Sequence, residues 1–326
     1  MIKSELLPPG PPERRHLISI ADLTREDVER LLGLARTFSR SLEREVKKLP
    51  TLRGRTVVSL FYESSTRTSS SFELAAKRLS ADVMSIKATG SAVDKGESLK
   101  DTALTIGAYD PDVVVIRHPH IGAPDVVARY TAAHVVNAGD GTHQHPTQAL
   151  LDLYTMEEEL GGIEGLHVAI VGDILHSRVA RSDIQALVLM GARVTVVGPP
   201  PLIPRGIEVL GCEVSYSIEA VRAADVIYVL RMQRERMLEG ANYVPSLREY
   251  TARWGITADR VRSGQKVMHP GPMNRGVEID PEVADAADAL IERQVRAGLV
   301  VRMAVLYDLL THGPVEVKVA EIEEVA

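Results

Sequence analysis

Short apolar segments alternate with segments of helical periodicity along most of this 326-residue chain. Residues 56–61 and 113–116 are runs of mainly β-branched and aliphatic side chains, which indicates buried strands. Residues 72–79 follow the first of these runs with apolar side chains at the spacing of an amphipathic helix. Repeated strand–helix alternation is typical of a parallel sheet covered by helices on both faces. The sequence therefore predicts an α/β fold of the doubly wound type.

The chain is too long for one hydrophobic core of ordinary size, so two domains are predicted. We place one doubly wound domain at residues 1–145 together with 295–326, and the other at residues 146–294. A long helix that begins at Pro146 would join them, and a long C-terminal helix would pack back on the first domain. Ligands of such sheets bind at the carboxyl ends of the strands, so we expect the active site in the crevice between the domains.

The composition excludes several classes of protein. With 38 basic and 44 acidic residues the net charge is −6, which argues against nucleic acid as the main partner. No apolar run approaches 18 residues and no charged-then-apolar leader opens the chain, so we expect neither a membrane protein nor a secreted one. The single Cys212 is incompatible with an intrachain disulfide framework or a Cys-rich zinc site. These features predict a cytoplasmic protein.

The segment 61–73 contains a candidate anion site. Ser65, Thr66 and Thr68 are good capping or first-turn residues, and they lie between a predicted strand and a predicted helix. A helix that begins there would direct free backbone N–H groups and its positive dipole end at one point, and Arg67 would add a full charge. This pattern favours a phosphate site, although a short motif of this kind is also compatible with an ordinary N-cap beside a surface arginine.

Charged or polar side chains occur after the carboxyl ends of five of the predicted strands. They are Arg67, Arg117, Asp173 with Arg178, Arg231 with Gln233, and the His-Pro-Gly-Pro run at residues 269–272. Any one of them could be a solvated loop residue. Because the strand ends of parallel sheets meet in one crevice, and because arginine grips carboxylate and phosphate with two bonds, the set together indicates a polyanionic ligand or two anionic ligands.

Two alternatives follow from other features. The run after the predicted strand at residues 167–171 has one glycine where a dinucleotide-binding unit needs G-x-G-x-x-G, so that class is rejected for this half. His143 and His145 are two residues apart, which is not the i, i+4 spacing of a helical zinc pair. His145 is compatible with a structural role, or with donating a hydrogen bond to a substrate carbonyl together with Gln148, one helical turn later.

Seven motifs in order resemble the aspartate/ornithine carbamoyltransferase family, and the resemblance covers roughly residues 15–312. They are residues 61–68, 95–98, 117–119, 140–148, 172–173 with Arg178, 231–236 and 269–272. The Arg-x-Gln-x-Glu-Arg and His-Pro-x-Pro motifs resemble the aspartate branch, and the Ser-Met-Gly and His-Cys-Leu-Pro motifs typical of the ornithine branch are absent from the sequence. The resemblance implies transfer of the carbamoyl group of carbamoyl phosphate to L-aspartate in pyrimidine biosynthesis, without a metal or an organic cofactor.

The resemblance also implies roles for individual residues. Carbamoyl phosphate would be bound by Ser65, Thr66, Arg67, Thr68, Ser91, Lys95, Arg117, His145 and Gln148. L-Aspartate would be bound by Lys95, Arg178, Arg231, Gln233, Gly271 and Pro272. The catalytic residues would be Arg67, Thr68, Lys95, Arg117 and His145, with the oxyanion stabilised by Thr68, Arg117 and His145. In the family Ser91 and Lys95 belong to a loop that enters the neighbouring subunit's site, which implies a homotrimer, alone or assembled with a regulatory chain or dihydroorotase.

Two positions depart from the family pattern. Ser69 and Ser70 follow Thr68 where relatives usually carry Arg or Lys, which removes one cation near the phosphate site. Gly271 stands where relatives often carry a larger apolar residue, so a looser pocket is expected there. Two alternatives to the implied activity remain, namely an inactive relative that only binds anionic metabolites or scaffolds an assembly, and a transcarbamoylase for another amine.

Overall fold

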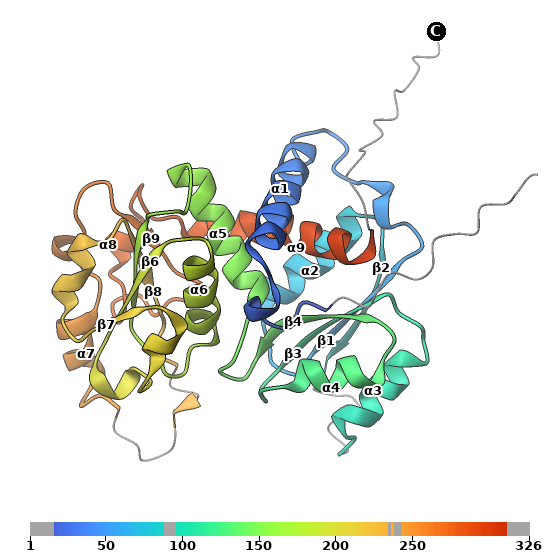
Figure 1. Ribbon diagram of the computed structural model, residues 1–326, viewed down its shortest axis with the longest axis horizontal. Helices are drawn as coiled ribbons and strands as arrows, with labels where there is room; N and C mark the ends of the chain where they lie inside the picture. Colours follow the sequence, from blue (N-terminus) through green and yellow to red (C-terminus); the bar gives the residue numbers. More distant parts are fainter. Residues whose placement is uncertain (1–15, 88–95, 234–235, 238–242, 312–326) are drawn as a thin grey trace, which may run out of the picture.

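Two parallel β-sheets with flanking helices form the two halves of the molecule, as Figure 1 shows. The structure is a computed structural model, and it describes residues 16–87, 96–233, 236–237 and 243–311. The two-sheet α/β architecture joined by long helices confirms the predicted fold class.

The first sheet has four parallel strands in the order β2-β1-β3-β4. Their bounds are β1 (Thr56–Phe61), β2 (Asp82–Lys87), β3 (Val113–His118) and β4 (His134–Asp140). Successive side chains of a strand point to opposite faces, and both faces of β3 are buried, which explains its unbroken β-branched run. The strand therefore requires a layer of helices on each side.

Those layers are formed by helices from both ends of the chain. On one face α3 (Leu99–Gly107) and α4 (Ala123–Tyr130) cover Val58, Val114 and Val135. On the other face α1 (Arg25–Ser41), α2 (Thr66–Arg78) and α9 (Ile291–Leu310) cover Val57, Val113 and Val136.

The second sheet has five parallel strands in the order β7-β6-β5-β8-β9. They are β5 (His167–Val171), β6 (Arg193–Val197), β7 (Glu213–Ser215), β8 (Val226–Val229) and β9 (Lys266–Met268). Helices α5 (Pro146–Leu160) and α6 (Arg178–Leu189) belong to the core on one face, while α7 (Leu247–Trp254) and α8 (Pro281–Ala284) lie toward the other side. Between β7 and β8 the chain forms a 3₁₀ helix, η6 (Ile218–Ala223).

Helix α9 connects the two halves. It packs against α1 and α2 of the first half and against α5, and it also contacts β9 of the second sheet. A helix that is buried on several sides must be apolar over most of its surface, and thirteen of the twenty residues of α9 are buried. The predicted domain boundaries at residues 145 and 294 stay a prediction.

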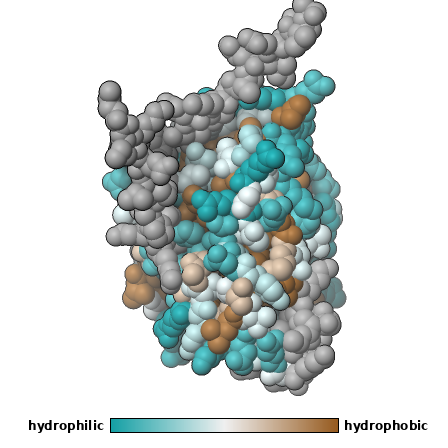
Figure 2. All heavy atoms as spheres, turned by 90° about the vertical axis from the view of Figure 1, so that its right-hand side faces the viewer, coloured by the Kyte–Doolittle hydropathy of each residue, from teal (hydrophilic) through white to brown (hydrophobic). Residues whose placement is uncertain are grey.

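The outer surface contains few continuous apolar areas in the view of Figure 2, where hydrophobic side chains lie in small groups among polar ones. None of the helices in the described ranges combines the length and apolar character needed to cross a membrane.

Candidate active site

A cavity of about 1030 Å³ lies where the carboxyl ends of the strands of both sheets meet. Twelve of the residues predicted from the sequence line it: Ser65, Thr66, Arg67, Thr68, Arg117, His145, Gln148, Arg178, Arg231, Gln233, Gly271 and Pro272. Two further predicted residues, Ser91 and Lys95, lie outside the described residues. The cavity brings together side chains more than 200 residues apart in the sequence, but the role of each remains a prediction.

The start of α2 forms one wall of the cavity. Ser65 is the N-cap, and its hydroxyl accepts a weak hydrogen bond from the backbone N–H of Thr68, at 3.4 Å. A helix start leaves backbone N–H groups without partners inside the helix, so this wall presents donors and a positive dipole end to the cavity. Ser69 donates a hydrogen bond from its hydroxyl to the carbonyl of Ser65, at 2.6 Å, so this side chain binds the backbone of its own helix.

Arg67 extends from α2 to the loop that follows β9. Its Nη1 donates a hydrogen bond to the backbone carbonyl of Pro270, at 3.1 Å. The next residue, Gly271, has φ of 64°, and an ideal Cβ placed on it would overlap the Arg67 guanidinium. The absence of a side chain at Gly271 therefore creates the space that Arg67 occupies.

The carboxylate of Glu63 forms ion pairs with three arginines that line the cavity. Its carboxylate lies 2.6 Å from Arg178 Nη2, 3.3 Å from Arg117 Nε and 3.7 Å from Arg236 Nη2. Burial alone would raise the pKa of Glu63, but the charges of Arg178, Arg117 and Arg236 outweigh it and bring that pKa below its ordinary value. Glu63 is consequently ionised at neutral pH, and it links the end of β1 to the second half of the chain.

Sequence reasoning missed the role of Glu63, although a signal was present. It directly precedes the Ser-Ser-Thr-Arg segment, and it is an acidic residue at the end of a strand whose crevice is otherwise cationic. An acid in that place must pair with some of those cations, because an unpaired buried carboxylate is costly.

Arg117 and His145 face the same part of the cavity. Burial and the nearby charge of Arg178 lower the pKa of Arg117 to about 9, so Arg117 is still positively charged at pH 7. His145 is 3% exposed, and burial together with the charges of Arg117 and Arg178 holds its pKa well below 6.5. Its imidazole is therefore neutral, and its Nδ1 has no hydrogen-bond partner among the described residues.

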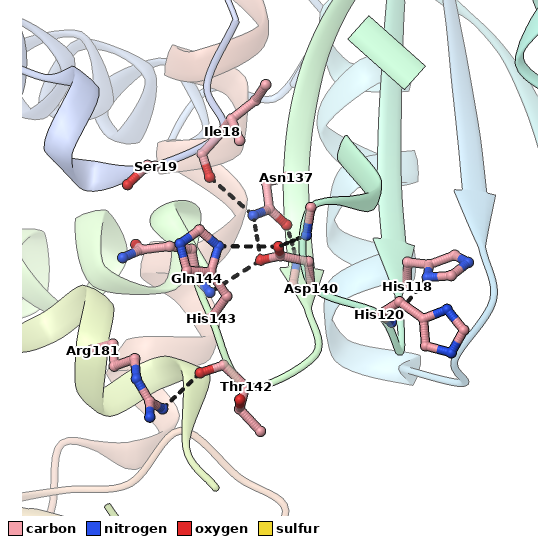
Figure 3. A network of polar contacts seen from close by, with 12 residues as sticks. Ile18, Ser19, His118, His120, Asn137, Asp140, Thr142, His143, Gln144 and Arg181 are labelled. Atoms are coloured by element: carbon pink, nitrogen blue, oxygen red, sulfur yellow. Dashed lines mark hydrogen bonds and ion pairs between the residues drawn. The ribbon is translucent and has the colours of Figure 1, made fainter. Parts of the chain in front are cut away.

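The loop that carries His145 is fixed by Asp140, whose carboxylate lies at the centre of Figure 3. Asp140 is fully buried and accepts hydrogen bonds from Asn137 Nδ2 at 2.8 Å and from the backbone N–H of Gln144 at 3.0 Å. Asn137 also donates to the carbonyl of Ile18, which ties the N-terminal segment to the same loop. The backbone N–H of His145 then donates to Ser182 of α6, at 2.8 Å. His145 is thus placed by contacts from three parts of the chain.

Asp173 was grouped with the cavity residues on sequence grounds, but it lies behind the wall. It is fully buried and accepts hydrogen bonds from His176 Nδ1 at 2.9 Å and from the backbone N–H of Gln233 at 3.1 Å. Its position fixes the segment after β8, which presents Arg231 and Gln233 to the cavity.

Helix α9 supplies cavity residues that the sequence did not reveal. Arg302 is 4% exposed, lines the cavity and places its guanidinium carbon 5.1 Å from the centre of the Phe72 ring. Burial lowers its pKa to about 10. Gln294 of the same helix also lines the cavity. The apolar periodicity of this helix concealed both residues, because nothing local marks one polar position of a buried helix as functional.

Comparison with known proteins agrees with this geometry. Residues 15–158 match the family model described as "Aspartate/ornithine carbamoyltransferase, carbamoyl-P binding domain", and residues 164–309 match "Aspartate/ornithine carbamoyltransferase, Asp/Orn binding domain". The aspartate carbamoyltransferase catalytic subunit of Acidothermus cellulolyticus is 56% identical over 303 residues, covering 92% of this chain and 93% of that protein. The corresponding subunit of Salinispora arenicola is 57% identical, over 91% and 98%.

Solved structures show the same similarity. Aspartate transcarbamoylase of Trypanosoma cruzi, in complex with carbamoyl phosphate and aspartate, superposes with a TM-score of 0.83 at 32% identity, covering 92% of this chain and 98% of that one. The catalytic subunit of the M. jannaschii enzyme gives 0.79 at 37% identity, over 90% and 97%. With both halves matched by family models and with identities above 50%, the chain belongs to the aspartate/ornithine carbamoyltransferase family.

Proposed function

We propose that this chain transfers the carbamoyl group of carbamoyl phosphate to the amine of L-aspartate, which gives N-carbamoyl-L-aspartate and phosphate in pyrimidine biosynthesis. The observation that carries this proposal is the single cavity onto which the start of α2 and arginines of both halves converge. Relatives at 54–57% identity are aspartate carbamoyltransferase catalytic subunits, and the T. cruzi enzyme has been solved with both substrates.

The donor substrate fits the wall made by α2. Its phosphate carries about two negative charges, which suit the helix N-terminus and the side chain of Arg67. Ser65 and Thr66 begin that helix and offer hydroxyl and backbone N–H donors. We assign carbamoyl phosphate to these residues together with Thr68, Arg117, His145 and Gln148, and with Ser91 and Lys95.

Transfer begins when the amine nitrogen of aspartate attacks the carbonyl carbon. The carbonyl oxygen becomes an oxyanion, for which Thr68, Arg117 and the neutral imidazole of His145 are suitable donors. The bond between the carbonyl carbon and the phosphate oxygen then breaks, and the departing phosphate takes the proton of the amine. Because the amine is the nucleophile and phosphate is the leaving group, positioning and electrostatics suffice and no organic cofactor is required.

The acceptor substrate fits the opposite wall. Arg178, Arg231 and Gln233 are donors suited to the two carboxylates of aspartate, and we assign them that role with Lys95 and the backbone of Gly271 and Pro272. A second ammonium group, as in ornithine, would be repelled by this wall and would leave its donors unpaired. A site built to bond polar groups discriminates strongly against ligands that lack them, often by about 10⁴-fold.

A comparison of amine acceptors tests the assignment. With saturating carbamoyl phosphate, kcat/KM is measured for L-aspartate, ornithine, putrescine and N-acetylornithine by a colorimetric assay for the carbamoylated product. L-Aspartate should give the highest value, and N-phosphonacetyl-L-aspartate, which the T. cruzi enzyme binds in a crystal, should inhibit tightly because it joins both anionic groups in one molecule. A higher value for any other acceptor would contradict the aspartate assignment, and no activity with any acceptor would favour a binding protein.

We further propose that the active unit is a cytoplasmic homotrimer whose sites are shared between subunits. The support is the family resemblance of the Ser91–Lys95 segment, which supplies residues to a neighbouring site in relatives. Lys95→Ala and His145→Ala, each inactive alone, should regain activity when their subunits are exchanged, because some sites would then be undamaged. Hybrids that form by mass measurement yet remain inactive would place each site within one chain.

The same proposal assigns carbamoyl phosphate to a domain of residues 1–145 with 295–326, and aspartate to residues 146–294. The packing of α9 on α1 and α2 supports the return of the C-terminal segment to the first half.

A further inference from the structure

A buried carboxylate lies directly behind Gln148. Asp152 is 2% exposed and occurs one turn after Gln148 on α5. Gln148 Nε2 lies 3.2 Å from its Oδ1 and 3.1 Å from its Oδ2. The same carboxylate accepts hydrogen bonds from Tyr228 at 2.7 Å and from Gln294 Nε2 at 2.6 Å. Three donors from three different elements therefore converge on Asp152.

This arrangement determines which end of the Gln148 amide faces the substrates. Burial raises the pKa of Asp152 to about 7, and the hydrogen bonds from Tyr228, Gln294 and Gln148 oppose that rise because they favour the ionised form. In that form the carboxylate can only accept hydrogen bonds, so its neighbour must direct the NH₂ group toward it. A reversed amide would place its oxygen about 3.1 Å from two carboxylate oxygens, where like partial charges repel. Gln148 lines the cavity, and no described residue donates to its Oε1. The atom left for the ligand is therefore an acceptor.

Asp183 is a second buried carboxyl group near Asp152, and it serves as a control for the general effect of a buried carboxyl group. It is also 2% exposed and lies close enough to Asp152 and Tyr228 for both to affect its pKa, but within the described part of the chain neither of its oxygens lies in hydrogen-bond geometry with a partner. Burial raises the pKa of both carboxyl groups, but that of Asp183 rises well above its ordinary value because it also lies beside Asp152, whereas three donors hold that of Asp152 to about 7. Of the two, Asp183 is therefore the one that holds a proton, and Asp152 receives the donors. Asp183 makes no hydrogen bond to Gln148 or Gln294, which makes it a matched control.

We propose that Asp152 is a positioning residue that holds the Gln148 amide with its oxygen toward the cavity, and that it thereby makes the site selective for a donor with an NH₂ group on the carbonyl carbon. The inference rests on the proposed function. Carbamoyl phosphate can donate to Gln148 Oε1, whereas acetyl phosphate, which has a methyl group in that place, leaves this acceptor unpaired. An acceptor that loses its partner in a desolvated site costs affinity.

The experiment compares the two phosphates as ligands and as donors. The ratio of the Kd of acetyl phosphate to that of carbamoyl phosphate is first measured by calorimetry without an amine. The ratio of kcat/KM is then measured with L-aspartate. In Asp152→Asn the new NH₂ group can face Gln148, so the amide loses its fixed orientation. We expect both ratios to fall about tenfold, the equivalent of one lost hydrogen bond, and to stay within about threefold of wild type in Asp183→Asn.

Equal ratios in wild type and in a folded Asp152→Asn, or an equal loss in Asp183→Asn, would overturn the inference. If the wild-type protein distinguishes the two phosphates in binding but never carbamoylates aspartate, the acceptor assignment is wrong. The Kd ratio then still tests the role of Asp152. If Asp152→Asn does not fold, a comparison of Gln148→Glu with the double variant Gln148→Glu, Asp152→Asn tests the inference instead. Gln148→Glu places two carboxylates together, while in Gln148→Glu with Asp152→Asn the new NH₂ group at position 152 can donate to the new carboxylate at position 148, which directs an acceptor oxygen to the cavity. The double variant must be the more selective of these two, and if it is not, the inference is wrong.

Discussion

The side chain of Arg67 and the carbonyl of Pro270 are joined by a hydrogen bond of 3.1 Å, which links α2 in the first half to the loop after β9 in the second. Any phosphate that binds at the start of α2 competes with this carbonyl for the guanidinium. The dianion has the advantage, because its negative charge attracts the guanidinium in addition to accepting its hydrogen bonds.

Arg67→Ala should nearly abolish turnover and leave the fold intact. The residue is a full positive charge at a helix start that would hold phosphate, and the loss of such a contact in the transition state costs several kcal/mol. Steady-state kinetics and circular dichroism measure the two effects. A folded variant within about tenfold of the wild-type kcat, a difference of only ~1.4 kcal/mol, would remove Arg67 from the phosphate site.

Gly271→Ala should lower the KM for carbamoyl phosphate about fivefold. The added Cβ would occupy the position of the Arg67 guanidinium, so Arg67 must leave Pro270, and phosphate no longer displaces a hydrogen bond worth about 1 kcal/mol. The positive φ of Gly271 should also cost about 1 kcal/mol of stability, visible as a lower thermal midpoint. Gly276→Ala, at φ of 79° with open space around it, is the control for the backbone effect alone. An unchanged KM in Gly271→Ala would show that the contact with Pro270 does not compete with substrate.

Glu63→Gln should raise the KM for aspartate by tenfold or more, a loss of about 1.4 kcal/mol. Removal of the carboxylate leaves Arg178, Arg117 and Arg236 without their shared counter-charge, so the arginines separate and the two halves lose an ion pair across the cavity. Kinetics with each substrate varied in turn separates this effect from one on carbamoyl phosphate. Glu73→Gln, on the exposed side of α2 in an i, i+4 pair with Lys77, should change neither KM. Identical kinetics of the Glu63 and Glu73 variants would exclude a role for the cluster.

Asp183→Asn should stabilise the fold, and increasingly so as the pH rises. The pKa of Asp183 is raised in the folded state, so the proton that it holds favours folding fully below its unfolded pKa of about 3.9, and this contribution is lost as the pH rises toward the folded pKa. The loss amounts to ~1.4 kcal/mol per pH unit, and asparagine does not titrate. Thermal midpoints of both proteins at pH 5.5, 6.5 and 7.5 should diverge steadily. A constant difference across that range would mean that Asp183 is ionised in the folded protein.

The strands and the polar residues after them could be predicted because short stretches of sequence determine both. Residues 56–61 and 113–116 are buried on both faces, Arg117 lies near the carboxyl end of β3, and Arg67 lies in the first turn of the helix that follows β1. Parallel topology then brings the strand ends together without further information. For the same reason twelve predicted site residues line one cavity.

The contacts across the cavity could not be predicted in this way. Glu63 pairs with Arg178, which is 115 residues away in the sequence, and Asp152 pairs with Gln294, which is 142 residues away. Neither pairing therefore produces a local sequence pattern. Arg302 is one polar position in a helix that is otherwise apolar on several sides, and only the packing of α9 against α2 shows that it reaches the cavity. Helix α7 was missed although its start carries a signal, since Ser246 accepts a hydrogen bond from the backbone N–H of Glu249.

The packing of α9 against α1 has a consequence for the synthesis of the chain. The two helices close the same face of the first sheet, yet one is near the beginning of the described sequence and the other is at its end. A ribosome that adds 5–20 residues per second needs on the order of ten seconds or more between them. During that interval the part of the apolar face of α1 that α9 will cover lacks its partner, although the strands of the first sheet already exist. The nascent chain therefore carries an open hydrophobic surface until α9 has been synthesised, which is the kind of surface that chaperones bind.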